Sequence, residues 1–546
     1  MHRRAFTEIA RIESISSSGR KIALRSSVAA FQRRGVGVKR SVMTKSTAYQ
    51  ALAAELKEID SLSGIDAILG WDELVIMKER SAESRAAQKS ALASVIHSRQ
   101  TSEKLGALIA GAEQESKGLN AMELASVRDA RLKYDRKTKM PEELAKLEAS
   151  LGSEGYQSWA KARASDDYDM FKPVLEKIIK LRIDEAKAVA PEKLPYDYQI
   201  DKFERGMKAE RLTEIFDSVK EGLVPLIQEI TSATQLDIDS RLAGGEAAPT
   251  FEVPKQEALC ADVMDKLGFE GRLDVSLHPF TGGTQSDVRI TTRYDEKDFL
   301  SSLAGLVHET GHALYEQNRP SKDHHGMPVS EALSMGIHES MSLLFERMVG
   351  QSLEFWTFLR PTVAKTFDFT NNLEPYAFYE AINKVEKSLI RVDADELTYP
   401  LHIIIRFELE QGLFNGSINV DNLPEKWNEL YKQYLGIEPE SNKSGCLQDV
   451  HWGSLAFGYF PSYTLGAMYA AQFFQHAEKS IPTLREEIAE GNFINLRQWL
   501  KENIHSKGSL YPSADELCEA VTGKKLDPTI YLDYLKKKYR TLYKIE

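Results

Sequence analysis

From Thr47 onward, apolar residues recur three and four positions apart, which is the period of an amphipathic helix. The spacing is clear in residues 48–75 and returns in residues 84–112, 142–163, 171–190 and 209–233. No low-complexity linker interrupts residues 46–546. The pattern therefore predicts a single, mostly α-helical domain over residues 46–546.

One stretch, residues 272–294, has the alternating apolar and polar residues that are typical of β-strands. Its two halves flank Thr281-Gly282-Gly283-Thr284, a sequence rich in turn-forming residues. We therefore expect a small antiparallel sheet in which residues 281–284 form the turn.

The most specific local signal is the run His308-Glu309-Thr310-Gly311-His312. Histidines four residues apart lie on one face of a helix, so both imidazoles can reach one metal ion. Catalytic zinc has three protein ligands and one position open for water. Glu309 is then placed to take a proton from that water. The motif predicts a zinc site built on a helix.

The third ligand has to come from another segment. The metzincin pattern would need Gly and His where this chain has Tyr315 and Asn318, which excludes that class. A second helix is predicted over residues 330–349, with Ser330 as its N-cap. We favour Glu339 in this helix, because a carboxylate among apolar residues is costly without a partner and His-His-Glu is a known zinc set. The competing ligands are His338, His324 and His325.

Composition narrows the class of protein. The 546-residue chain is 42% hydrophobic and 28% charged, as soluble globular proteins usually are. It has no run of about 18 apolar residues, so no membrane-spanning helix is predicted. Its formal net charge of −11 argues against nucleic-acid binding, which needs a basic surface. Three widely spaced cysteines, Cys260, Cys446 and Cys518, indicate a reducing compartment and no disulfide framework.

Residues 1–45 differ in charge from the rest of the chain. They contain eleven Lys or Arg and two acidic residues, a formal charge of +9, which leaves −20 for the remainder. They are also rich in serine and have no long apolar run. These features predict a disordered organelle transit peptide, addressed to the mitochondrial matrix or the plastid stroma, and exclude a secretory signal. The alternative is a basic tail without an address.

Six motifs follow one another along the chain: His278-Pro279-Phe280, Asp287 to Thr291, His308 to His312, His338-Glu339-Ser340, Ile390 to Asp395, and Gly445 to Trp452. In this respect residues 46–546 resemble the carboxypeptidase Taq family of metallocarboxypeptidases. The family often has Gln after the His-Glu-Ser triplet, where this chain has Met341. The resemblance implies a large all-helical, saddle-like fold with a groove, and a homodimer. It also implies removal of C-terminal residues from peptides, with zinc as the metal and cobalt as a substitute.

A carboxypeptidase has to bind a free carboxylate, and the two-pronged guanidinium of arginine does this best. Arg289 and Arg391, each in one of the family motifs, are the candidates. The alternative for each is a structural ion pair with a nearby aspartate. His451 is a further candidate for substrate binding.

Supporting roles are expected for three more residues. Asp449 and His278 are expected to orient metal ligands or substrate through hydrogen bonds, without binding the metal themselves. Tyr459 is the candidate hydrogen-bond donor to the oxyanion of the tetrahedral intermediate, and Tyr463 is its rival.

Two other functions share part of this evidence. A helical zinc oligopeptidase or dipeptidyl carboxypeptidase would use the same metal and base but would need no carboxylate-binding arginine. A non-catalytic zinc-containing binding protein is disfavoured, because structural zinc usually has four protein ligands and no cysteine lies near the motif.

The basic N-terminal stretch allows a test of targeting. If it is a transit peptide, the mature protein begins between about residue 35 and residue 47. N-terminal sequencing of the native protein checks this. An intact Met1 would contradict the prediction, and a start at Met43 would indicate a cytoplasmic form.

Overall fold

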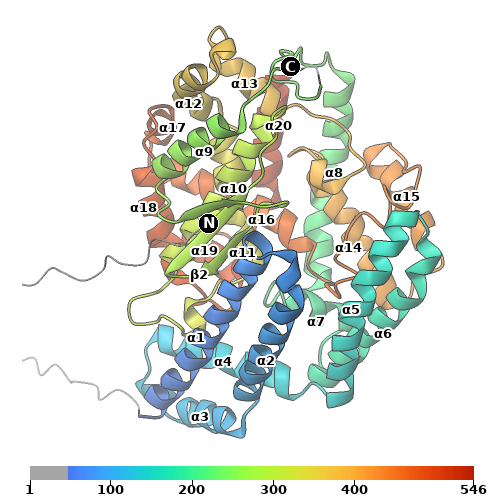
Figure 1. The fold of residues 1–546 in the computed structure, drawn as a ribbon, viewed down its shortest axis with the longest axis vertical. Helices are drawn as coiled ribbons and strands as arrows, with labels where there is room; N and C mark the ends of the chain where they lie inside the picture. Colours follow the sequence, from blue (N-terminus) through green and yellow to red (C-terminus); the bar gives the residue numbers. More distant parts are fainter. Residues whose placement is uncertain (1–46, 247, 546) are drawn as a thin grey trace, which may run out of the picture. The chain divides into compact units, whose positions relative to one another are not determined.

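Helices make up most of the computed structural model, which describes residues 47–246 and 248–545 (Figure 1). The predicted mostly helical fold with a small sheet is confirmed. No helix of the described residues is long and apolar enough to cross a membrane. The three cysteines are buried and unpaired, as expected. The predicted transit peptide lies outside the described residues.

The helices before the sheet are α1 (Thr47–Val75), α2 (Ala82–Gln100), α3 (Glu103–Gln114), α4 (Ala121–Thr138), α5 (Glu142–Ser165), α6 (Lys172–Val189), α7 (Pro195–Asp201), α8 (Ala209–Ser232) and α9 (Val253–Leu267). The helices after it are α10 (Phe299–Asn318), α11 (Met335–Leu343), α12 (Leu353–Thr366), α13 (Pro375–Ile382), α14 (Tyr399–Asn415), α15 (Leu423–Leu435), α16 (Pro461–Ser480), α17 (Leu484–Ala489), α18 (Ile494–Asn503), α19 (Ala514–Thr522) and α20 (Pro528–Leu542).

The sheet packs against α10 and has the strand order β1-β3-β2. Strand β2 (Thr281–Thr284) pairs antiparallel with β3 (Asp287–Thr292), whereas β1 (Arg272–Val275) pairs parallel with β3. The prediction of a turn at residues 281–284 is wrong, because these residues are β2 itself. The turn lies instead at residues 285–286, between β2 and β3, and the strands that flank β2 in the sequence pair parallel, not antiparallel as expected. Helix α1 covers β2, and a Cβ at Gly282 would lie 3.2 Å from the Trp71 ring.

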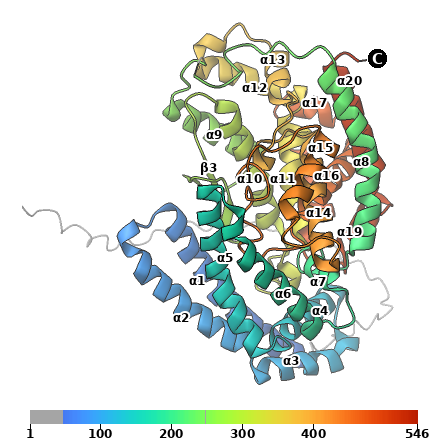
Figure 2. The same ribbon diagram turned by 90° about the vertical axis from the view of Figure 1, so that its right-hand side faces the viewer.

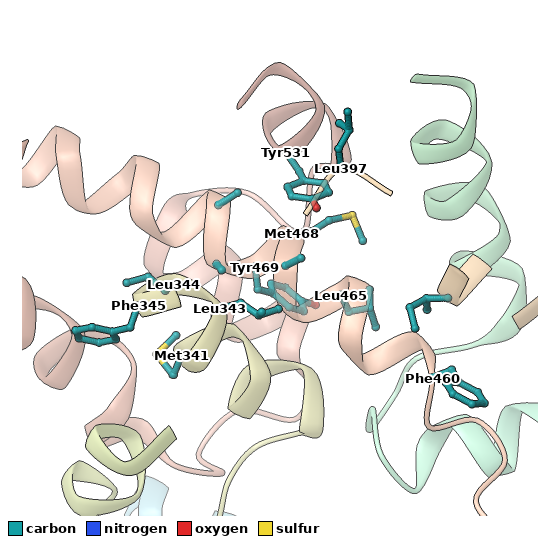
Figure 3. Close-up of a cluster of buried hydrophobic side chains, with 14 of the residues drawn as sticks. Met341, Leu343, Leu344, Phe345, Leu397, Phe460, Leu465, Met468, Tyr469 and Tyr531 are labelled. Atoms are coloured by element: carbon teal, nitrogen blue, oxygen red, sulfur yellow. The ribbon is translucent and has the colours of Figure 1, made fainter. Parts of the chain in front are cut away.

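In both views α10, α11 and α16 lie in the middle of the described helices (Figures 1 and 2). Helix α11 packs extensively along α16 and also against α10. Figure 3 shows Met341 and Leu343 of α11 together with Leu465, Met468 and Tyr469 of α16 in one buried hydrophobic cluster. Helix α11 is therefore packed between α16 and α10.

The sequence explains where α10 begins and ends. The side chain of Asp298 accepts a hydrogen bond from the Ser301 backbone N–H at 3.1 Å and caps the first turn. The helix ends before Arg319, which is extended because Pro320 follows it. Between these ends runs a buried apolar stripe that seats the helix in the core: Phe299, Leu303, Leu306 and Leu314.

The second predicted helix begins later than expected. Ser330 is not its N-cap, because the Ser330 hydroxyl donates to the Pro320 carbonyl inside a separate turn. Helix α11 starts after Ser334, whose Oγ accepts the Ile337 N–H at 3.1 Å. The chain then continues from α11 into a π-helical segment, η5 (Leu344–Gly350).

Candidate active site

Helices α10 and α11 bring three side chains of metal-binding type together. The ligand atoms of His308, His312 and Glu339 all lie within 4.8 Å of one another. Within residues 47–246 and 248–545, no other group of three or more His, Cys, Asp or Glu meets this criterion. The structure thus assembles the predicted ligand set at one point.

Hydrogen bonds fix the orientation of both imidazoles. His308 Nδ1 lies 2.6 Å from Glu346 Oε2, and His312 Nδ1 lies 3.0 Å from the His338 carbonyl oxygen. Because each Nδ1 is engaged in this way, each Nε2 is left to bind a metal. His312 Nε2 is 3.4 Å from the carboxylate of Glu339.

The surroundings of Glu339 keep its carboxylate ionised and pack closely against its side chain. Burial alone would raise its pKa, but the hydrogen bond from His312 and the charges of His308 and Arg347 lower that pKa to about 2. Behind it, a Cβ at Gly466 of α16 would lie 2.8 Å from the Cβ and Cγ of Glu339. The glycine therefore leaves room for the carboxylate side chain and holds it in one place.

The competing ligands point elsewhere. The His338 ring packs against the His312 ring, with centroids 4.4 Å apart, but its Nε2 lies 2.9 Å from Glu316 Oε1 and it does not belong to the metal-binding group. His325 Nδ1 is 3.3 Å from Gln285 Oε1, and neither it nor His324 belongs to the metal-binding group. The geometry favours Glu339 over all three histidines.

Glu309 is held by a residue that sequence reasoning missed. The Thr281 hydroxyl, on β2, donates to Glu309 Oε2 at 2.6 Å. The Glu309 side chain is buried, and its backbone lies one residue after His308 on α10. Strand β2 therefore orients the carboxylate that was predicted to act as the base.

Glu346 was also missed, although the sequence contains a signal for it. It follows Glu339 by seven residues, and in the helix predicted over residues 330–349 this spacing of about two turns would place both carboxylates on one face. Burial raises the pKa of Glu346, but the hydrogen bond and charge of His308 outweigh burial and lower it. An ionised Glu346 can hold the His308 ring in the orientation that a metal needs.

The two candidate arginines have different surroundings. Arg289 forms a one-to-one ion pair with Asp287 at 2.6 Å and lies over the Trp71 ring. Arg391 lies 2.9 Å from Asp449, but Arg406 lies 2.6 Å from the same carboxylate. Two guanidinium groups thus share one aspartate, which leaves one unit of positive charge on the group formed by Arg391, Arg406 and Asp449 and none on the Arg289–Asp287 pair.

Aromatic and imidazole side chains surround Arg391. Arg391 Nη1 donates to the Tyr399 hydroxyl at 2.9 Å, and the Tyr463 ring lies 5.2 Å from its guanidinium carbon. His451 Nε2 is 3.4 Å from the Tyr463 hydroxyl, and burial lowers the pKa of His451 to about 4, so this imidazole is neutral. The excess positive charge at Arg391 is therefore not increased by His451 near neutral pH.

Tyr459 lies beside this cluster and near the metal-binding group. Its ring packs against those of Tyr463, His451 and Phe203. Burial and then the charge of Glu339 raise the pKa of Tyr459, so its hydroxyl keeps the proton that it would donate.

Asp449 and His278, which were expected to orient metal ligands or substrate, have different surroundings. Asp449 supports Arg391 rather than a metal ligand. His278 is exposed, and no hydrogen bond joins its side chain to His308, His312 or Glu339, so the structure does not support its predicted role. The neighbouring Pro279 and Phe280 instead pack against Gly305 of α10 and Trp71 of α1.

Comparison with known proteins identifies the family. The family model described as carboxypeptidase Taq (M32) metallopeptidase matches residues 51–539. The chain belongs to this family. It is 38% identical to thermostable carboxypeptidase 1 of Thermus thermophilus over 516 residues, 92% of this chain and 100% of the relative. It is 37% identical to carboxypeptidase 1 of Bacillus subtilis, over 89% of this chain and 97% of the relative.

Solved structures agree with the family assignment. The M32 carboxypeptidase of Deinococcus radiodurans has a TM-score of 0.87 and 36% identity, covering 91% of this chain and 100% of that one. Metallocarboxypeptidase 1 of Trypanosoma cruzi has a TM-score of 0.86 at the same identity and coverage. The predicted family is confirmed, and the chain is a metallocarboxypeptidase, a peptide hydrolase.

The residues present fit the divalent metal that an M32 metallopeptidase requires. Two imidazoles with engaged Nδ1 atoms and one ionised carboxylate converge at one point. This donor set of two nitrogens and one oxygen is the kind used by catalytic metal sites, with a position left for water.

The contact between Glu346 and His308 yields a prediction about metal affinity. Glu346→Gln should weaken metal binding by about 10- to 100-fold, because the neutral amide holds the His308 ring less firmly. Titration of the metal against a chromogenic chelator measures this. Glu316→Gln is the matched control, since Glu316 contacts an imidazole nitrogen of His338, which lies outside the metal-binding group. Equal affinities of the Glu346→Gln variant and the unmutated protein would contradict the role.

Proposed function

We propose that this M32 enzyme is a zinc-dependent carboxypeptidase that uses Glu309 as general base and Arg391 to bind the terminal carboxylate of a peptide. The observation that carries the proposal is the unit of uncompensated positive charge shared by Arg391 and Arg406, next to Tyr399, which binds Arg391 and feels the charge of the metal-ligand candidate Glu339. A buried positive charge of this kind favours a negatively charged ligand group. A peptide with a free C-terminus supplies one.

His308, His312 and Glu339 would hold the metal. A divalent cation bound there would act as a Lewis acid toward the last peptide carbonyl and lower the pKa of a bound water to about 7. We propose zinc, which nitrogen and carboxylate ligands suit, with cobalt as a substitute.

Protein side chains account for the other parts of the reaction. Glu309, aligned by Thr281, takes a proton from the attacking water and returns it to the leaving amine. The Tyr459 hydroxyl donates a hydrogen bond to the oxyanion of the tetrahedral intermediate. Arg391 fixes the substrate carboxylate, so that the last peptide bond, and no other, reaches Glu309.

Two further proposals concern assembly and location. The family resemblance supports a homodimer, whose mass in solution can be measured by light scattering. The charge of +9 in residues 1–45 supports import into an organelle matrix or stroma. The N-terminal sequence of the native protein tests the second proposal.

Glu309→Gln tests the base. The amide keeps the size of the side chain but cannot accept the proton, so kcat should fall by about 10²- to 10⁴-fold. Metal content, measured by elemental analysis, should stay close to that of the unmutated protein, because Glu309 is not a ligand. A variant that holds its metal and turns over at a near-normal rate would exclude Glu309 as the base.

C-terminal amidation of the peptide tests the carboxylate site. Amidation removes the charge of the terminal carboxylate without altering the scissile bond. The lost ion pair with Arg391 is worth about 1.5–3 kcal/mol, so kcat/KM should fall about 10- to 100-fold. In Arg391→Ala, free and amidated peptides should be cut at similarly low rates. This change leaves Asp449 paired with Arg406, so no buried charge is left without a partner.

Arg289→Ala is the matched control, and it should keep the preference for a free carboxylate. If the unmutated enzyme cuts free and amidated peptides equally well, no carboxylate is recognised. The oligopeptidase alternative would then replace the carboxypeptidase.

A further inference from the structure

Glu204 lies in the turn that follows α7 and is 1% exposed. Its carboxylate accepts a hydrogen bond from the backbone N–H of Gly336, in the first turn of α11. The carbonyl of the preceding residue, Phe203, accepts the Met335 N–H at 3.0 Å. Two N–H groups that the helix itself cannot satisfy are thus bound by the α7 turn.

The contact requires a glycine on the helix. A Cβ at Gly336 would lie 2.8 Å from Glu204 Oε1 and 3.1 Å from its Cδ, and both groups are enclosed. Only glycine lets the carboxylate reach the helix backbone at this point. The first turn of α11 therefore cannot shift toward the α7 turn, and a shift away would break the hydrogen bond.

The carboxylate is costly to bury. Among the described residues no cationic side chain forms an ion pair with Glu204, and the hydroxyls of Ser334 and Ser462 are its nearest side-chain partners. Burial raises the pKa of Glu204 to about 7, and these hydroxyls and the Gly336 N–H only partly offset burial. The Gly336 N–H, at the positive end of the α11 dipole, is thus one of three groups that offset this cost, beside the hydroxyls of Ser462 and Ser334.

Glu339 lies three residues after Gly336, about one turn along the same face of α11. A nine-residue helix moves nearly as a rigid body, so a displacement of its first turn also displaces Glu339. The backbones of His308 and His312 belong to α10 and would not follow, and the contacts of their Nδ1 atoms with Glu346 and the His338 carbonyl would be disturbed as well.

We propose that Glu204 is a positioning residue for the metal centre: its carboxylate anchors the first turn of α11 and so places Glu339 opposite His308 and His312. This inference rests on the proposed function, in which these three residues bind zinc. The role is distinct from catalysis, since Glu204 contacts neither a ligand side chain nor the space between the ligands.

Zinc affinity of the full chain, measured with Zn²⁺ alone against a chromogenic chelator, tests the proposal. Glu204→Ala should raise the Kd by about ten-fold or more, as loss of a supporting partner usually does. Glu204→Gln should bring it back to within about three-fold, because the amide oxygen can still accept the Gly336 N–H. Gly336→Ala should also weaken binding by about ten-fold, because its Cβ displaces the helix from the carboxylate.

Glu410→Gln is the matched control. Glu410 is equally buried, burial raises its pKa to about 7, and it binds the Gly458 N–H at 2.8 Å instead of α11. Its zinc Kd should stay within about three-fold of the unmutated value, because α11 is untouched. A change as large as that of Glu204→Ala would indicate a general loss of structure and overturn the proposal.

Further outcomes would be decisive. A folded Glu204→Ala variant with unchanged zinc affinity would overturn the proposal. If circular dichroism shows that this variant does not fold, unchanged zinc affinity of Gly336→Ala would overturn it instead. Failure of the proposed function has a different signature. The unmutated protein would then not bind zinc, or Glu339→Ala would bind it equally well.

Discussion

The active site depends on how closely α11 approaches its two neighbours. At Gly311 of α10, a Cβ would collide with the Met341 carbonyl oxygen and lie 2.7 Å from the Cα of Ser342. At Gly466 of α16, a Cβ would collide with Glu339. Glycine weakens an isolated helix by up to about 1 kcal/mol relative to alanine. The two glycines compensate for this loss of helix stability, because without a Cβ they let α11 lie close enough for Glu339 to meet the two histidines.

The same packing explains why so many charges can be buried near the site. Glu339 and Glu346 face His308, His312 and Arg347, while Asp449 faces Arg391 and Arg406. Glu204 and Glu410 are buried in this region without forming an ion pair with any residue that the structure describes. They bind backbone N–H groups of α11 and of the segment before α16, so helix placement substitutes for ion pairing.

Met341 shows how a departure from the family pattern is accommodated. Its sulfur lies 3.3 Å from Nε2 of the buried His505, in a position where the family often has a glutamine. A thioether is a weak acceptor, and burial lowers the pKa of His505 to about 3, which keeps the imidazole neutral. Met341 therefore packs beside His505 without leaving an unpaired charge next to α11.

The helical class, and the candidate base and two candidate ligands on α10, could be predicted from the sequence, because they follow from spacing along one helix. The sequence also indicated Glu339 and, through six ordered motifs, the family. Tertiary structure decided what depends on contacts between distant segments. Thr281 reached Glu309, Glu204 reached Gly336, and Arg406 joined Asp449, none of which a one-dimensional pattern contains. The turn expected at residues 281–284 lies at residues 285–286, because residues 281–284 pair with β3, and that pairing depends on the rest of the sheet and not on local turn preference.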